Sequence, residues 1–257
     1  MKYRVDINSD LGESFGAYTI GNDAQLMRHI TSANIACGFH ASDPTVMAQT
    51  IKLAKKHRVA VGAHPGYPDL AGFGRREMKL TSEEIENSVV YQTGALAGFA
   101  KTEGLALQHV KPHGALYNKA AEDEQTAKAI VNAVKSLDPN LIIFAPPNSV
   151  LAKTAADRKM RVAAEFFADR AYNPDQSLVS RAKPNAIFHD SKKILERTVK
   201  AVTEGVVETI DNKTIKLGKI HSICIHGDTP SAVKLVETLR KGLAKAKIEI
   251  KAVGTFI

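Results

Sequence analysis

The stretch Val59–Arg76, VAVGAHPGYPDLAGFGRR, marks the point where a buried strand ends and a shaped loop begins. Its first three residues form a short apolar run of the kind that fits a parallel strand covered on both faces. Glycines and prolines follow and fix unusual backbone conformations. The loop also carries polar side chains, namely His64, Tyr67, Asp69, Arg75 and Arg76. A loop of this composition at the end of a strand indicates a functional site.

The same alternation of a short apolar strand and a longer amphipathic segment runs along the whole chain. The predicted strands are Tyr3–Asn8, Ser32–Cys37, Val59–Gly62, Leu107–Val110, Leu141–Phe144, Arg161–Glu165 and Ser222–His226, with Ile248–Val253 as a candidate eighth. The predicted helices are Asp23–Ile30, Pro44–Lys56, Ser82–Glu103, Glu122–Leu137, Ser149–Asp157, Ser191–Glu204 and Pro230–Lys245. Repeated units of this kind imply parallel strands joined by right-handed crossovers. Seven or eight units predict an α/β fold, a closed or nearly closed (β/α)7-8 barrel.

The chain shows no linker, low-complexity segment or shift in composition, so we expect a single domain over residues 1–257. The segment VVETIDNKTIKL, residues 206–217, predicts a small β-hairpin inserted beside the last units. Hydrophobic residues make up 44% of the chain and charged residues 24%, which is typical of a globular protein with a well-buried core.

Composition excludes several classes of protein. The net charge of +8 could suggest an acidic partner, but the lysines are spread along predicted helix faces without interleaved aromatic residues, which argues against nucleic acid. The two cysteines, Cys37 and Cys224, stand in apolar runs and favour a reducing compartment over a disulfide framework. No apolar stretch approaches the ~20 residues of a membrane span, and the start of the chain lacks a signal-peptide pattern. We therefore expect a cytoplasmic protein, and the sequence leaves homo-oligomerisation open.

Polar side chains stand at the carboxyl ends of six of the predicted strands. Because side chains alternate along a strand, residues two apart share a face. The residues concerned are Asp6, Asn8 and Asp10, then Asn34 and His40, then His64, then His109, Lys111 and His113, then Glu165, and finally His226 and Asp228. His40 joins this set only if the chain stays extended past Gly38. In a parallel barrel these ends converge on one mouth, so the pattern predicts a single polar site.

Each of these residues also has an ordinary structural interpretation. A single histidine after a strand is more often a loop residue with satisfied hydrogen bonds than a ligand. Asp10 and Glu13 could cap the next turn, and residues 166–185 could form a solvated surface loop. The joint pattern favours function, because four of the nine histidines fall at strand exits. These four are His40, His64, His113 and His226.

Six segments together resemble a known family, the LamB/YcsF family. They are DINSDLGES, SANIACGFHASDP, GAHPGYPDLAGFGRR, HVKPHGALYN, FFADRAYNPDQSLVSR and ICIHGDTPSA, in this order along residues 6–232. The resemblance implies a barrel related to the glycoside hydrolase and metal-dependent deacetylase barrels. It also implies one component of an ATP-dependent 5-oxoprolinase, which acts with two partner subunits to open 5-oxoproline to L-glutamate.

Lactam opening requires a base, groups that stabilise developing anions and a grip on the substrate carboxylate. Our hypothesis assigns the base to Asp10 or Glu13, anion stabilisation to Lys111 and His113, and the carboxylate clamp to Arg170 or Arg181. Further substrate-binding candidates are Asn8, His64, Arg75, Glu165, His226 and Asp228. A divalent metal is a second candidate cofactor, with Asp10, His40 and His64 as its predicted ligands.

ATP has no obvious site in the sequence, because no G-x-x-x-x-G-K-[ST] loop occurs. Nucleotide binding would then use another surface or a partner subunit. Two alternatives stay open at this point. One is a metal-dependent amide or N-acetyl hydrolase of the deacetylase type, and the other is a non-catalytic subunit that binds the substrate.

Overall fold

Seven parallel strands close into a barrel in the computed structural model, which describes residues 3–227 and 232–257. The ring consists of β1 (Tyr3–Leu11), β2 (Ser32–Ala36), β3 (Ala60–His64), β4 (Leu107–Val110), β5 (Ile142–Ala145), β6 (Arg161–Phe167) and β9 (Ser222–Cys224). It closes because β9 pairs in parallel with both β6 and β1. The predicted fold class is therefore confirmed, with seven strands in the barrel.

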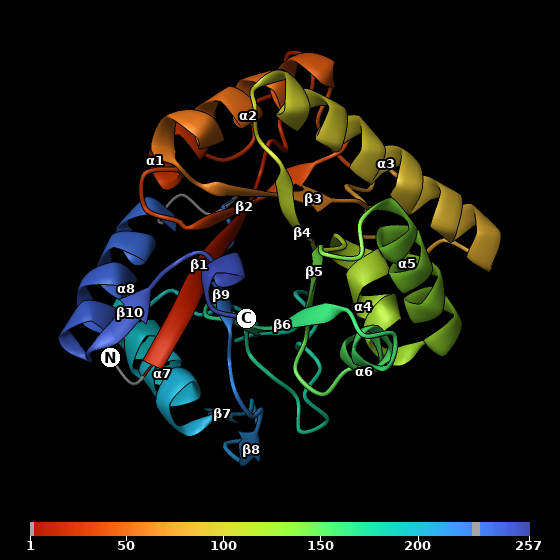
Figure 1. Cartoon of the computed structure of the whole chain (residues 1–257). Coiled ribbons are helices and arrows are strands. Elements are labelled where there is room, and N and C mark those ends of the chain that lie inside the picture. The colour runs from red at the N-terminus through yellow and green to blue at the C-terminus, as the bar shows by residue number, and fades with distance from the viewer. Residues whose placement is uncertain (1–2, 228–231) are drawn as a thin grey trace.

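Helices surround the ring of strands (Figure 1). They are α1 (Asp23–Leu26), α2 (Pro44–His57), α3 (Ser82–Thr102), α4 (Gly114–Glu122), α5 (Glu124–Leu137), α6 (Val150–Asp157), α7 (Ser191–Glu204) and α8 (Ala232–Lys245). Local sequence explains several starts. The Asp43 side chain accepts hydrogen bonds from two backbone N–H groups of α2, and Thr81 forms a reciprocal capping box with Glu84 at α3.

The interior of the barrel changes character from one end to the other. At the amino-terminal end it is apolar, where Phe144 and Val253 belong to one small cluster. The short 3-10 helix η1 (Val253–Thr255) supplies Val253, and Figure 1 shows the C-terminus at the centre of the ring. Further along, the interior is polar, because the buried Asp6 accepts hydrogen bonds from Ser32 and Ser222. The polar layers lead toward the carboxyl ends of the strands.

The candidate eighth strand does not join the ring. β10 (Ile248–Ile250) pairs with Tyr3–Val5 of β1, whereas β9 pairs with Asp6–Asn8 and completes the closure. The structure also contains a helix that the sequence did not predict, α4, and the predicted helix Asp23–Ile30 ends at Leu26. The predicted start of the last helix, Pro230, lies outside the described residues.

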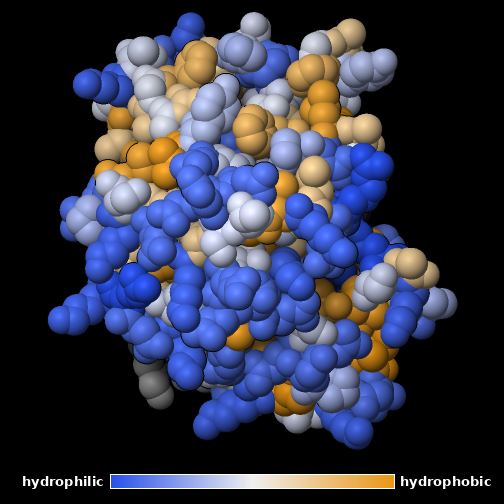
Figure 2. Space-filling model, turned by 90° about the vertical axis from the view of Figure 1, so that its right-hand side faces the viewer, coloured by the Kyte–Doolittle hydropathy of each residue, from blue (hydrophilic) through white to orange (hydrophobic). Residues whose placement is uncertain are grey.

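An antiparallel hairpin lies between α7 and β9. Its strands are β7 (Val206–Glu208) and β8 (Thr214–Lys216). Polar side chains cover much of the face shown in Figure 2, and hydrophobic ones gather toward its upper part and its right-hand edge. Over residues 3–227 and 232–257, no helix combines the length and the apolar character that a membrane span requires.

Candidate functional site

A cavity of about 410 Å³ opens at the carboxyl ends of the strands. Nine of the residues predicted from the sequence line it, namely Asp10, Glu13, His64, Arg75, Lys111, His113, Arg170, Arg181 and His226. Asn8, His40 and Glu165 are buried beside these residues but do not line the cavity itself. Asp228 lies outside the described residues. The strand ends therefore converge on one polar site, as barrel geometry requires.

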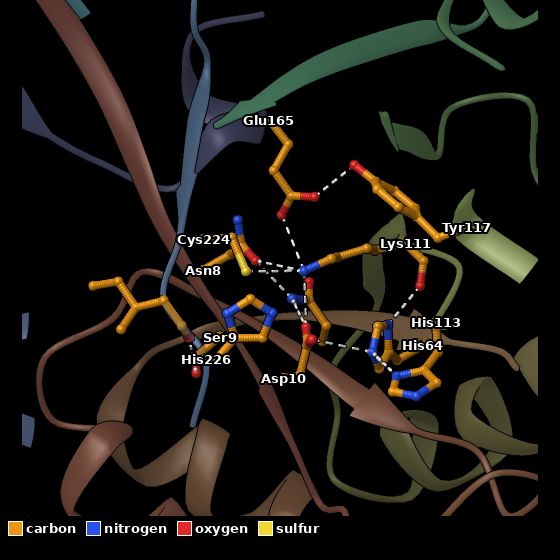
Figure 3. Close-up of polar contacts among 12 residues, drawn as sticks. Asn8, Ser9, Asp10, His64, Lys111, His113, Tyr117, Glu165, Cys224 and His226 are labelled. Carbon is orange, nitrogen blue, oxygen red and sulfur yellow. Dashed lines mark hydrogen bonds and ion pairs between the residues drawn. The ribbon is translucent and has the colours of Figure 1, made fainter. Parts of the chain in front are cut away.

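Lys111 is the central cation of the site. Its Nζ lies 2.9 Å from Asp10 Oδ1 and 3.0 Å from Glu165 Oε1. It also donates to Asn8 Oδ1 at 3.3 Å and to Cys224 Sγ at 3.2 Å (Figure 3). Burial alone would lower the pKa of Lys111, but these acidic neighbours hold it well above its ordinary value. Lys111 is thus a permanent ammonium that binds two strands of the barrel together.

Asp10 is held as a carboxylate. Burial alone would raise its pKa, but the neighbouring His64 and Lys111 outweigh burial and keep the pKa well below its ordinary value. Asn34 adds a hydrogen bond, donating from Nδ2 to Asp10 Oδ1 at 2.8 Å. A carboxylate stabilised in this way has a low affinity for protons and is therefore a weak general base.

A cluster of histidines lies beside Asp10. His64 Nδ1 is 2.7 Å from the Lys111 carbonyl oxygen, and His113 Nε2 is 2.9 Å from the Phe73 carbonyl oxygen. Carbonyl oxygens only accept hydrogen bonds, so both of these nitrogens carry a proton. The two remaining nitrogens, His64 Nε2 and His113 Nδ1, lie 2.9 Å apart. In neutral rings, each of these nitrogens directs a lone pair at the other.

Carboxylate and imidazole groups complete this cluster. Glu13 Oε1 lies 3.4 Å from His113 Nδ1 and 3.2 Å from His40 Nε2. Burial, reinforced by the neighbouring His40 and His64, holds the pKa of His113 well below its ordinary value. Burial likewise holds the pKa of His40 well below its ordinary value. The cluster therefore directs several lone pairs toward one small space, where a bound cation would be stabilised by them.

The geometry of the cluster suits a metal ion. One ligand atom from each of Glu13, His40, His64 and His113 lies within 4.8 Å of the others. At metal–nitrogen distances of about 2.1 Å, two nitrogens on one ion lie roughly 3.0 to 3.4 Å apart, close to the His64–His113 separation. The carboxylate beside His40 is Glu13 and not Asp10, the ligand predicted from the sequence. Asp10 Oδ2 lies 3.4 Å from His64 Nε2, and its other oxygen contacts Lys111.

The glycine-rich loop after β3 packs directly against these histidines. A Cβ added to Gly66 would lie 2.7 Å from His40 Nδ1, and one added to Gly74 would lie 2.7 Å from the Cβ of His40. Larger residues would displace His40 at both positions. The loop therefore has this composition because it forms the wall of the histidine cluster.

Three arginines also line the cavity: Arg75, Arg170 and Arg181. Arg170 donates from Nη2 to the Val179 carbonyl oxygen at 2.6 Å, which ties the loop after β6 to itself. Its side chain is largely buried, and burial lowers its pKa. Cationic groups gathered beside a small cavity favour an anionic ligand.

Comparison with known proteins places the whole chain in one family. The family model described as "LamB/YcsF family" matches residues 5–257. The chain belongs to the LamB/YcsF family. A relative from Pyrococcus abyssi, named as a subunit of 5-oxoprolinase, is 52% identical over 254 residues, covering 99% of each chain. One from Alkaliphilus metalliredigens with the same name is 51% identical over 248 residues, covering 96% of each.

A solved structure supports the same placement. The lactam utilization protein from Thermus thermophilus is 44% identical and superposes with a TM-score of 0.91. The alignment covers 97% of this chain and 99% of that one. This chain and the Thermus thermophilus protein therefore share the same barrel over nearly their full lengths.

Two residues of this LamB/YcsF site were not identified from the sequence. Tyr117 on α4 donates its hydroxyl proton to Glu165 Oε2 at 2.6 Å. Asp169, directly after β6, contacts His226 Nδ1 through both carboxylate oxygens. Strand alternation would have found Asp169, since Glu165, Phe167 and Asp169 are two residues apart. Tyr117 carried no such signal, because its helix was not predicted.

Proposed function

We propose that this chain is the LamB/YcsF component of an ATP-dependent 5-oxoprolinase, which opens 5-oxoproline to L-glutamate. The observation that carries this proposal is the end-to-end identity of about half with relatives named as a subunit of that enzyme. The name of the Thermus thermophilus protein, which refers to lactam utilization, points to the same substrate class. The cavity agrees in size and charge with a small anionic ring compound.

Within this function we assign Glu13 as the general base. Asp10 is engaged by Lys111 and His64, which leaves its carboxylate weakly basic. In this assignment Lys111 would stabilise the charge that develops on the carbonyl oxygen, and Arg170 or Arg181 would hold the substrate carboxylate. His113 would not donate directly to that oxygen, because its Nε2 proton is donated to the Phe73 carbonyl oxygen.

We further propose a divalent cation held by His40, His64 and His113, with the Glu13 carboxylate beside it kept free to act as the base. The facing lone pairs of His64 and His113, whose other ring nitrogens donate to carbonyl oxygens, support this proposal. Such an ion would polarise the lactam carbonyl or acidify a water molecule.

Metal content tests this site independently of activity. Wild-type protein equilibrated with zinc or manganese and then dialysed should retain about one ion per chain, measured by plasma emission, and should unfold at a higher temperature. His113→Gln should lose both effects, while the surface variant His29→Gln should keep them. Wild-type protein that retains no ion and shows no thermal shift would remove the metal from the proposal.

ATP is used by the complex in this proposal, and two partner subunits complete it. The chain has no phosphate-binding loop of the P-loop type, so we assign ATP binding to the assembled complex. Both cysteines are buried and unpaired, which agrees with a cytoplasmic location.

Glutamate release from 5-oxoproline tests the function. The assay is run on the chain alone and then with its two partner proteins, with and without ATP. We expect activity only in the full mixture with ATP, and a loss of at least a hundredfold for Glu13→Gln but not for the exposed Glu83→Gln. Activity of the chain alone on small amides without ATP would instead favour a metal-dependent amide hydrolase, the alternative that the histidine cluster supports. Substrate binding with full activity of Glu13→Gln would favour a non-catalytic subunit.

A further inference from the structure

Asp169 and His226 follow two neighbouring strands and meet at the mouth of the barrel. β6 and β9 pair with Phe167 opposite Cys224, so the residues two positions further on fall opposite each other. His226 Nδ1 lies 3.0 and 2.9 Å from the two carboxylate oxygens of Asp169. Asp169 is buried and His226 is largely so, with exposed side-chain fractions of 4% and 11%. Strand register therefore builds this contact.

The contact fixes where the imidazole carries its proton. A carboxylate only accepts hydrogen bonds, so the Nδ1 atom of His226 is the donor. Burial alone would raise the pKa of Asp169, but the charge of His226 outweighs burial and lowers it. The ionised Asp169 can then stabilise a charged imidazolium, and Nε2 becomes the atom that exchanges protons.

The His226 ring lies in the wall of the candidate-site cavity. It lines the same cavity as Asp10 and Lys111, and one of its nitrogens lies within 4.8 Å of an Asp10 oxygen. Figure 3 shows His226 on one side of Asp10 and Lys111 and the pair His64 and His113 on the other. The site thus has two groups able to exchange protons, His226 and Glu13. The ion pair of Asp10 and Lys111 lies between them and does not exchange protons.

The geometry points to His226 as the group that protonates the lactam nitrogen when the ring opens, with Asp169 as its positioning residue. This inference rests on the proposed function and assigns one further step within it. An amide nitrogen leaves poorly without a proton, because the free amide anion is very strongly basic. A proton donor placed away from the base meets this requirement, since the two groups do not neutralise each other.

The step balances as a hydrolysis. Water adds through its oxygen to the carbonyl carbon, and its proton passes to Glu13. The C–N bond breaks, its electron pair remains on nitrogen, and that nitrogen takes the Nε2 proton of His226. His226 regains a proton from solvent and Glu13 releases one, so the net change is the addition of water across the amide bond.

The test compares two substrates in the reconstituted complex. One is 5-oxoproline, and the other is its lactone analogue, in which a ring oxygen replaces the nitrogen and leaves with less need of a proton. We expect His226→Gln to lower kcat for the lactam about a hundredfold or more, with KM within threefold, and to lower lactone turnover less than tenfold. Asp169→Asn should act in the same direction and less strongly. The exposed His189→Gln is the matched control.

A pH profile gives a second readout. The wild-type kcat for 5-oxoproline should fall on the alkaline side as the proton donor titrates, and His226→Gln should lose this limb of the profile. Equal losses on both substrates, a change confined to KM, or an unaltered alkaline limb would overturn the inference while leaving the proposed function intact. A wild-type complex that releases no glutamate would overturn both.

Discussion

Replacement of Lys111 by methionine would leave two carboxylates facing each other in the barrel without their cation. Lys111 Nζ contacts Asp10 and Glu165 at 2.9 and 3.0 Å, and Glu165 is fully buried. At an effective dielectric constant of about 20, each contact of this length contributes roughly 5 kcal/mol of attraction, much of which desolvation offsets. Removal of one partner from a buried pair typically costs about 3 to 5 kcal/mol, and we expect Lys111→Met to fall in this range.

The pH dependence of this loss identifies its cause. Wild-type Asp10 has a lowered pKa, so it contributes stability above about pH 4 that is lost as the pH falls further. In Lys111→Met the unfavourable contact is between two charged carboxylates, and protonation of either relieves it. The deficit relative to wild type should therefore be largest near neutral pH and shrink toward about pH 4.

Urea unfolding at several pH values measures both effects. Lys111→Met/Glu165→Gln should recover part of the loss, because it removes one of the two opposed charges. Lys119→Met, which breaks only the exposed contact with Glu77, is the control and should change the midpoint little. A loss below about 1 kcal/mol for Lys111→Met, or a deficit independent of pH, would refute this account of the charge network.

Two further predictions concern His109 inside the barrel. A Cβ on Gly62 would lie 2.1 Å from His109 Nε2, and the His109 ring is stacked on Phe144 with the ring centres 4.2 Å apart. Gly62→Ala should therefore lower the free energy of unfolding, measured in urea, by about 3 kcal/mol. A decrease of less than about 1 kcal/mol would show that the His109 ring can move aside. Burial lowers the pKa of His109 to about 3, so its contribution to stability is complete above about pH 6.5 and is lost progressively toward pH 3. His109→Gln, which keeps a donor for Asn34, should therefore show a shallower loss of unfolding free energy between about pH 6.5 and 5, and an unchanged slope would contradict the assignment.

The strands of the barrel were predictable because their apolar runs are short and bounded by turn residues. Helix α4 was not, because its start carries no capping signal. His113 occupies the N-cap without a side-chain hydrogen bond, and Gly114 follows with a positive φ of 51°. β10 was predicted as a strand, but its place in the sheet was not. β10 pairs with the first half of β1 and β9 with the second half, and tertiary packing decides which strand pairs where.

The convergence of polar residues on one mouth was also predictable, since strand alternation and barrel geometry suffice for it. Which residues contact each other was not. Gly12 and Gly38 adopt positive φ values of 69° and 93°, so the chain stops being extended directly after β1 and β2. The turn after Gly38 brings His40 to Glu13, and the alternation that pointed to Asp10 no longer applies. Backbone conformations of this kind follow from the packed loops around them.

The coupling to ATP in the proposed function bears directly on His226. Phosphorylation of a lactam oxygen by ATP releases ADP, makes the carbonyl carbon more electrophilic and reduces the need for anion stabilisation by Lys111 or a metal. After water adds and the C–N bond breaks, the phosphoryl group is on the new carboxyl group, and a second water releases it as inorganic phosphate. After water has added, the nitrogen of the tetrahedral adduct still leaves poorly as an anion, so a proton donor stays necessary in an activated reaction. Variants of the His64 and His113 side of the cavity should therefore be partly compensated by activation, whereas variants of Asp169 and His226 should not. Within the ATP-dependent complex, replacement of His226 should therefore lower kcat more than replacement of His64.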